Sequence, residues 1–136
     1  AAGLAWAATA PRTPPETGSH LASKPWSADR LAALRGEGRP VLVNFTADWC
    51  LSCKTNEATA LSSRRVARAL ERAEAVYLVA DWTRRDAAIA VELARHGRSG
   101  VPLYLVYPAD GGEPEVLPQL LTEGRVVASL ENAARR

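Results

Sequence analysis

The chain has 136 residues and a mass of 14.6 kDa, enough for one domain and a tail but too little for two ordinary domains. Hydrophobic residues make up 47% and charged residues 24%, which is typical of a globular domain and excludes a disordered chain. The net charge of +2 gives no indication of nucleic-acid binding, and no apolar run is long enough to span a membrane. Because methionine is absent, we expect a processed form or a piece of a longer protein.

The first 24 residues are not expected to join the folded core. Residues 1–8 are small and apolar, and residues 10–19 have the proline- and threonine-rich composition of an extended linker. Two interpretations of residues 1–8 remain open: a disordered tail, or the end of a transmembrane helix with Trp6 near the membrane interface. We therefore predict a tail and linker over residues 1–24 and one folded domain over residues 25–136.

Hydrophobic periodicity and turn residues predict alternating helices and strands in the folded part. The helices are expected over residues 27–35, 50–60, 64–72, 85–96 and 122–134. The strands are expected over residues 41–46, 76–80, 101–107 and 115–117. The residues of the fourth helix expected to face the core are Ala88, Val91 (or Ala87), Leu93 and Ala94. This order predicts a mixed sheet flanked by helices, with the first strands parallel and an antiparallel hairpin at one edge.

The only two cysteines, Cys50 and Cys53, lie three positions apart. One short-loop bridge cannot replace a hydrophobic core, so a disulfide-dense secreted scaffold is excluded. A four-cysteine zinc site is excluded by ligand count, and His20 and His96 lack the paired spacing of a zinc finger. A redox pair, a two-cysteine metal site and a chance pairing remain.

The position of the cysteines favours the redox pair. Cys50 follows a predicted buried strand and opens a helix, where free backbone N–H groups and the helix dipole stabilise a thiolate and lower its pKa. Cys53 lies one turn further on the same side of the helix. It is therefore within reach to close a disulfide with Cys50 or to attack a mixed disulfide formed there.

Several segments resemble known proteins. Residues 45–54, FTADWCLSCK, resemble the active site of the thioredoxin superfamily, in which a strand runs into a Cys-x-x-Cys motif. Residues 100–102, Gly-Val-Pro, resemble the cis-proline loop of that superfamily. Residues 47–50, 54–57 and 80–83 are similar to the C-terminal periplasmic domain of the DsbD family of thiol:disulfide interchange proteins.

This resemblance implies a thioredoxin fold and a thiol:disulfide oxidoreductase, a protein-disulfide reductase. Such a domain relays reducing equivalents from a membrane-embedded cysteine pair of the same parent protein to periplasmic thiol proteins. The resemblance further implies a periplasmic domain of a bacterial inner-membrane protein, monomeric in isolation, with no metal, nucleic acid or cofactor besides the Cys50–Cys53 disulfide. The alternatives are a stand-alone anchored thioredoxin-like protein for cytochrome c maturation or metal resistance, and a non-redox peptide- or copper-binding module.

The resemblance also assigns roles to single residues. Cys50 is expected to be the nucleophile that forms mixed disulfides, and Cys53 the thiol that resolves them. Val101 and a cis Pro102 are expected to offer a backbone edge to the extended chain of a partner. Trp49 is expected to shield the cysteine pair and to add contact surface.

Asn44 departs from the family pattern, which usually places a buried Asp six residues before the first cysteine. An amide cannot take up a proton, so the usual base for the resolving thiol is missing. Glu57 lies one helical turn beyond Cys53 on the same face. We expect Glu57 alone to tune the thiols, by raising their pKa values and by moving the proton itself.

Overall fold

The computed structural model describes residues 21–136, so both interpretations of residues 1–8 concern a segment outside the described residues. The helices are α2 (Ala28–Gly36), α3 (Leu51–Ala58), α4 (Arg64–Ala73), α5 (Ala87–Arg95) and α6 (Glu123–Arg135), with a short 3-10 helix at Ala60–Ser62. The strands are β1 (Lys24–Pro25), β2 (Val41–Thr46), β3 (Val76–Asp81), β4 (Leu103–Tyr107) and β5 (Glu115–Val116). Within the described part, no helix is both long and apolar enough to cross a membrane.

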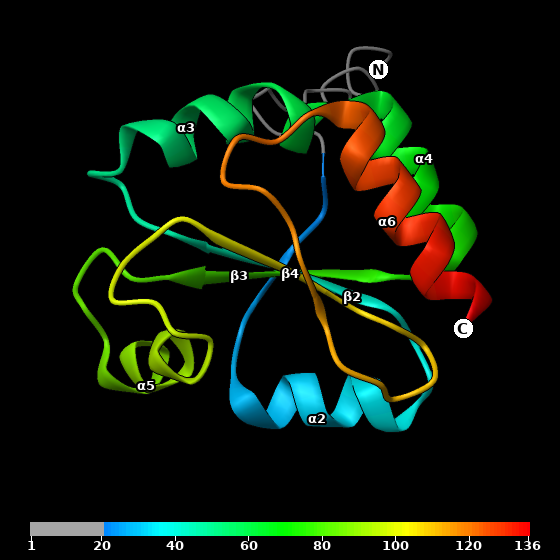
Figure 1. Ribbon diagram of the computed structural model, residues 1–136, viewed down its shortest axis with the longest axis horizontal. Helices are drawn as coiled ribbons and strands as arrows, with labels where there is room; N and C mark the ends of the chain where they lie inside the picture. The colour runs from blue at the N-terminus through cyan, green and yellow to red at the C-terminus, as the bar shows by residue number, and fades with distance from the viewer. Residues whose placement is uncertain (1–20) are drawn as a thin grey trace, which may run out of the picture.

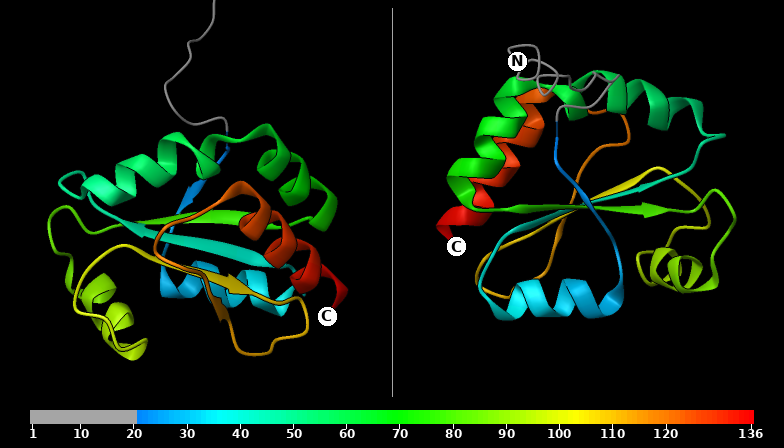
Figure 2. Two further views of the ribbon diagram at one scale, coloured as in Figure 1. Left: turned by 45° about the horizontal axis from the view of Figure 1, so that its top comes forward. Right: turned by 180° about the vertical axis from the view of Figure 1, so that it is seen from behind.

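The strands form one mixed sheet in the order β1-β3-β2-β4-β5. Strands β1, β3 and β2 run parallel, whereas β4 is antiparallel to β2 and β5 is antiparallel to β4. Helices α3, α4 and α6 lie on one side of the sheet, and α2 and α5 lie on the other (Figure 1). The view from behind in Figure 2 shows the same three layers. The predicted thioredoxin fold is confirmed.

The position of β2 at the centre of the sheet explains why its sequence is mostly apolar, with Asn44 and Thr46 as the polar exceptions. Successive side chains of a strand point to opposite faces, and both faces of β2 are covered by helices. Leu42 packs in a core cluster with Leu130 of α6, whereas Val43 and Phe45 pack in a second cluster with Ile89 of α5. The strand thus ends between two packed layers, which fixes the position of the turn that follows Thr46.

Helix α5 differs from its prediction. The side chain of Asp86 caps the helix by accepting a hydrogen bond from the Ile89 N–H (3.1 Å), so the helix begins at Ala87. Ile89 and Leu93, four residues apart, face the sheet and are buried. Of the residues predicted to face inward, only Leu93 does so; the others are exposed, namely Ala87, Ala88, Val91 (56%) and Ala94.

The other differences concern the ends of elements. The predicted helix over residues 50–60 ends at Ala58, and the chain continues into the 3-10 helix. Strand β1 was not predicted, because two residues carry no periodic pattern. Leu21 is buried and packs in the core, so ordered structure extends a few residues before the predicted domain boundary at residue 25.

Candidate active site

Cys50 sits at the junction between β2 and α3. Its backbone N–H donates to the Ala47 carbonyl (3.1 Å), which closes the turn after the strand. Cys50 is the residue that caps α3 rather than the first residue of its first turn, and its Sγ accepts a hydrogen bond from the Cys53 N–H (3.2 Å). A helix N–H group therefore points at this sulfur, as the position of the motif predicts.

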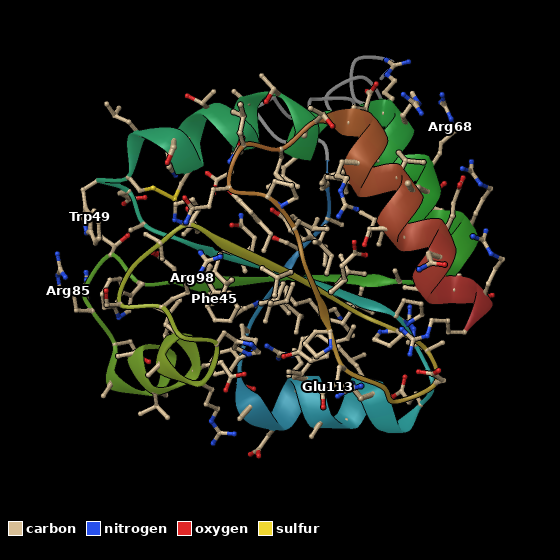
Figure 3. All side chains as sticks on the ribbon, viewed as in Figure 1. Phe45, Trp49, Arg68, Arg85, Arg98 and Glu113 are labelled. Atoms are coloured by element: carbon tan, nitrogen blue, oxygen red, sulfur yellow. A yellow bond between two sulfur atoms is a disulfide. The ribbon has the colours of Figure 1, made fainter. Side chains whose placement is uncertain are left out.

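The two cysteines are joined by a disulfide. Cys50 is 8% exposed and Cys53 is fully buried, so a partner can approach the disulfide only from the side of Cys50. Around it lie two exposed apolar side chains, Trp49 at 48% and Leu51 at 83% (Figure 3 shows the yellow sulfurs near the labelled Trp49). Disulfide exchange requires an attacking sulfur that a partner can reach, and of the two sulfurs Cys50 is the more exposed.

The loop before β4 lies next to the disulfide. Val101 packs against the buried cluster of Ala47, Cys50 and Cys53, and the Val101–Pro102 peptide bond is cis. This brings together the residues that the resemblance assigned to partner binding and the cysteines that it assigned to exchange.

Arg98 holds this loop in place and was not singled out by the sequence. Its Nη1 donates to the Pro102 carbonyl (3.1 Å), and its backbone N–H donates to the Leu93 carbonyl at the end of α5 (3.0 Å). Gly97, with φ +72°, makes the left-handed turn that this helix ending requires. One arginine therefore ties the cis-proline loop to the C-terminus of α5.

Behind the disulfide, Asn44 joins β2 to α3 and β3. Its Nδ2 donates to Oε2 of Glu57 (3.0 Å) and to the hydroxyl oxygen of Tyr77 (3.1 Å). The amide oxygen of Asn44 and the hydroxyl of Thr46 are buried without a hydrogen-bond partner among the described residues. Both residues line a cavity of about 260 Å³, which also meets Lys54 and Glu57. Asn44 therefore occupies the place of the usual acid as a donor to Glu57.

Sequence reasoning missed Tyr77, although strand pairing could have found it. Asn44 pairs with Val79 in the parallel β2–β3 ladder, and Tyr77 lies two residues earlier on the same face. Burial raises the pKa of Tyr77 above its ordinary value, so the phenol stays protonated and its oxygen can accept the hydrogen bond from Asn44.

Glu57 remains ionised at neutral pH. Partial burial raises the pKa of the Glu57 carboxyl. Contacts with the side chains of Thr46, Lys54 and Asn44, together with the charge of Lys54, lower it by more than burial raises it, so the pKa lies below its ordinary value. The Lys54 ammonium is 2.9 Å from Oε1 of Glu57. Glu57 thus lies one turn from Cys53 as predicted, but it does not stand alone.

Thr83, in the loop after β3, is hydrogen-bonded to the turn that precedes Cys50. Thr83 accepts a hydrogen bond from the Asp48 N–H on its hydroxyl (2.9 Å) and one from the Trp49 indole on its carbonyl (3.1 Å). The same hydroxyl donates to Oδ1 of Asp81 (2.5 Å), and this bond lowers the pKa of the Asp81 carboxyl. The orientation of the half-exposed Trp49 is therefore fixed by a segment more than 30 residues away.

In residues 21–136, no group of three or more His, Cys, Asp or Glu side chains is placed to hold a metal ion. His96 lies beside Glu92 at the end of α5 (3.3 Å), and the two sulfurs are bonded to each other. A thioredoxin fold with a Cys-x-x-Cys disulfide at a helix N-terminus defines a thiol:disulfide oxidoreductase domain.

Comparisons with known proteins agree with this class. A family profile described as thioredoxin-like matches residues 22–109. The chain therefore belongs to the thioredoxin-like family.

The chain is also similar to curated proteins named thiol:disulfide interchange protein DsbD. It is 34% identical to that of Cronobacter sakazakii over 103 residues, which cover 76% of this chain and 16% of the relative. It is 36% identical to that of Ralstonia nicotianae over 88 residues, 65% of this chain and 14% of the relative. The chain thus matches only 14–16% of the length of these relatives.

Among solved structures, the oxidised C-terminal domain of DsbD from Neisseria meningitidis superposes with a TM-score of 0.64 at 27% identity. The match covers 82% of this chain and 99% of that domain. The predicted similarity to the C-terminal domain of the DsbD family is confirmed.

Proposed function

We propose that this domain is a protein-disulfide reductase that relays reducing equivalents from a membrane-embedded cysteine pair of the same parent protein to periplasmic thiol proteins. The observation that carries the proposal is the Cys50–Cys53 disulfide, covered on all sides except that of Cys50 and lying beside a cis-proline loop. The similarity to DsbD proteins supports the relay, the periplasmic location and the attachment to an inner-membrane protein.

The exchange needs no metal or cofactor, because the cysteines themselves carry two electrons. In the reduced domain, the Cys50 thiolate attacks one sulfur of the partner's disulfide; a Cys50–partner bond forms and the partner's bond breaks, releasing one thiolate. The Cys53 thiolate then attacks Sγ of Cys50, which forms the Cys50–Cys53 bond and releases the second partner sulfur. The partner gains two electrons and two protons, and the domain loses the same number.

The Cys50–Cys53 disulfide is then reduced again by the same steps in reverse. A dithiol of the membrane-embedded donor attacks the Cys50–Cys53 disulfide, and the donor leaves oxidised. Cys50 is the site of attack in this direction also, because Cys53 is fully buried. The domain acts as a monomer and recognises proteins rather than nucleic acid.

Partner binding uses the side chains and backbone around the disulfide, namely Val101, Pro102 and Trp49. Val101 offers its backbone N–H and C=O to an extended partner chain, and the cis Pro102 keeps that edge turned toward Cys50. The indole of Trp49, held by Thr83, adds a fixed apolar surface.

Glu57 controls the protons of the exchange. Its carboxylate is ionised and lies one turn beyond Cys53, so it raises the thiol pKa values and accepts the proton that the Cys53 thiol loses. In the Glu57→Gln variant the alkylation of Cys50 should therefore shift to lower pH. An unchanged titration curve would remove Glu57 from the mechanism.

Trapping of mixed disulfides in cells tests the function. In the parent protein, a Cys53→Ser variant should accumulate covalent adducts that reductant releases, both with the membrane-embedded cysteine pair and with periplasmic thiol proteins. The matched control is the Cys50→Ser, Cys53→Ser double variant. Adducts with periplasmic proteins alone would favour a stand-alone anchored thioredoxin-like protein, and no adduct beyond the control would refute the reductase function.

A further inference from the structure

Arg85 is stacked on two tryptophans at the rim of the disulfide. Its guanidinium carbon lies 4.7 Å from the ring centre of Trp49 and 4.9 Å from that of Trp82, and the two rings are themselves 6.0 Å apart. Figure 3 shows Arg85 and Trp49 together at the edge of the molecule, between the start of α3 and α5. Because Trp49 directly precedes Cys50 in the chain, this stack fixes a positive charge on the Trp49 side of the disulfide site.

The backbone of Arg85 is constrained as well. Its φ is +56°, the left-handed region that long L side chains rarely adopt, and its N–H donates to the Trp82 carbonyl (2.9 Å). Such conformations persist where the surrounding structure holds them, and they concentrate at functional sites. The turn directs the Arg85 side chain back over Trp82 and onto Trp49.

Arg85 has no carboxylate partner among residues 21–136, because the neighbouring acids are engaged elsewhere. Asp48 is 3.9 Å from the Lys54 ammonium, and Asp81 accepts hydrogen bonds from Thr83. Asp86 caps α5. The aromatic contacts occupy the face of the guanidinium and leave its in-plane N–H donors available.

We propose that Arg85 is a specificity-determining residue, which selects partner segments that carry an Asp or Glu close to their reactive cysteine. A carboxylate accepts paired hydrogen bonds from the edge of a guanidinium, and the stack places that edge at Trp49, the residue that precedes Cys50. The inference rests on the proposed reductase function and adds to it a chemical preference among partners.

Reduction kinetics of synthetic peptide disulfides test this inference. Three peptides that differ only beside the cysteine, with Glu, Gln or Lys, are reduced by the wild-type domain and by Arg85→Asn, Arg85→Lys and Arg85→Glu variants. Asn tolerates the left-handed backbone, so the change removes the guanidinium without adding strain. The matched control is Arg84→Asn, which changes the exposed arginine that directly precedes Arg85 and is not part of the stack.

The wild-type domain should favour the Glu peptide over the Gln peptide in kcat/KM by about twofold to fivefold, as expected for one exposed ion pair. The preference should appear in KM, weaken at high salt and vanish in Arg85→Asn. Arg85→Lys should keep part of it, Arg85→Glu should favour the Lys peptide, and Arg84→Asn should behave as wild type.

The possible failures can be told apart. If Arg85→Asn slows all three peptides equally, or if the wild-type domain shows no charge preference, Arg85 is structural and the inference is wrong. If the wild-type domain reduces none of the peptides, the proposed function itself fails. Reduction potentials measured for each variant check that the redox pair is unchanged.

Discussion

Replacing Asn44 by Asp restores the acid that relatives usually carry, and we expect it to create a strongly coupled carboxyl pair. The amide Nδ2 of Asn44 is 3.0 Å from Oε2 of Glu57 and 3.1 Å from the Tyr77 hydroxyl oxygen. In Asn44→Asp an oxygen replaces the donor at this distance. Two ionised carboxylates would then be in direct contact, so one of them should keep a proton and donate it to the other.

The size of the effect follows from the separation. Two unit charges about 3 Å apart repel by about 5 kcal/mol at an effective dielectric constant of about 20. The Lys54 ammonium, 2.9 Å from Glu57, offsets part of this repulsion. We therefore expect a loss of about 2–4 kcal/mol in the free energy of unfolding when the shared proton is removed.

The stability of Asn44→Asp should fall as pH rises, which is the reverse of ordinary acid unfolding. The variant pair has one pKa raised above its unfolded value, so the pair is fully stabilised at low pH and loses that stability as pH rises through the raised value. Urea unfolding of Asn44→Asp at several pH values between 5 and 9 measures this loss. The control is Asn132→Asp, which adds the same charge at an exposed position of α6 and should follow the wild-type profile. Parallel profiles for the wild-type domain and Asn44→Asp would show that the two side chains do not share the predicted contact.

Three further changes test the packing and the charges. Asn56→Ala should cost about 3 kcal/mol in urea unfolding, because it removes three hydrogen bonds, two of them buried, that tie α3 to β4 and to the loop before α6. A cost below about 1 kcal/mol would contradict these bonds. Leu130→Ala should cost about 2–5 kcal/mol, since Leu130 is fully buried against the sheet; a smaller cost would indicate a loosely packed core. Because the pKa of Glu57 is lowered in the folded state, its carboxylate stabilises the fold above the unfolded carboxyl pKa, and this stabilisation is lost as pH falls through the folded pKa. Glu57→Gln should therefore flatten the acid side of the plot of unfolding free energy against pH. An unchanged acid side would show that the Glu57 carboxylate makes no stabilising contacts.

The sequence predicted the elements whose pattern is local. The mostly apolar run over residues 41–46 matches β2 because both faces of that strand are covered. The cysteine spacing predicts the disulfide because one helical turn brings the sulfurs together. Contacts between distant segments were not predictable in this way. The Trp49–Thr83 hydrogen bond and the Arg85 stack depend on how the loop after β3 folds back, which no periodicity records. The inward face of α5 was misjudged because the position of its cap sets its rotation.

The central claim is that Cys50, and not Cys53, is the sulfur that exchanges with other proteins. The direct measurement compares the Cys53→Ser and Cys50→Ser variants, each carrying one thiol, by the rate at which they form a mixed disulfide with the same oxidised peptide in intact-mass spectrometry. Because Cys50 is partly exposed and Cys53 is fully buried, we predict that Cys53→Ser reacts at least about tenfold faster. Equal rates, or faster reaction of Cys50→Ser, would contradict the account.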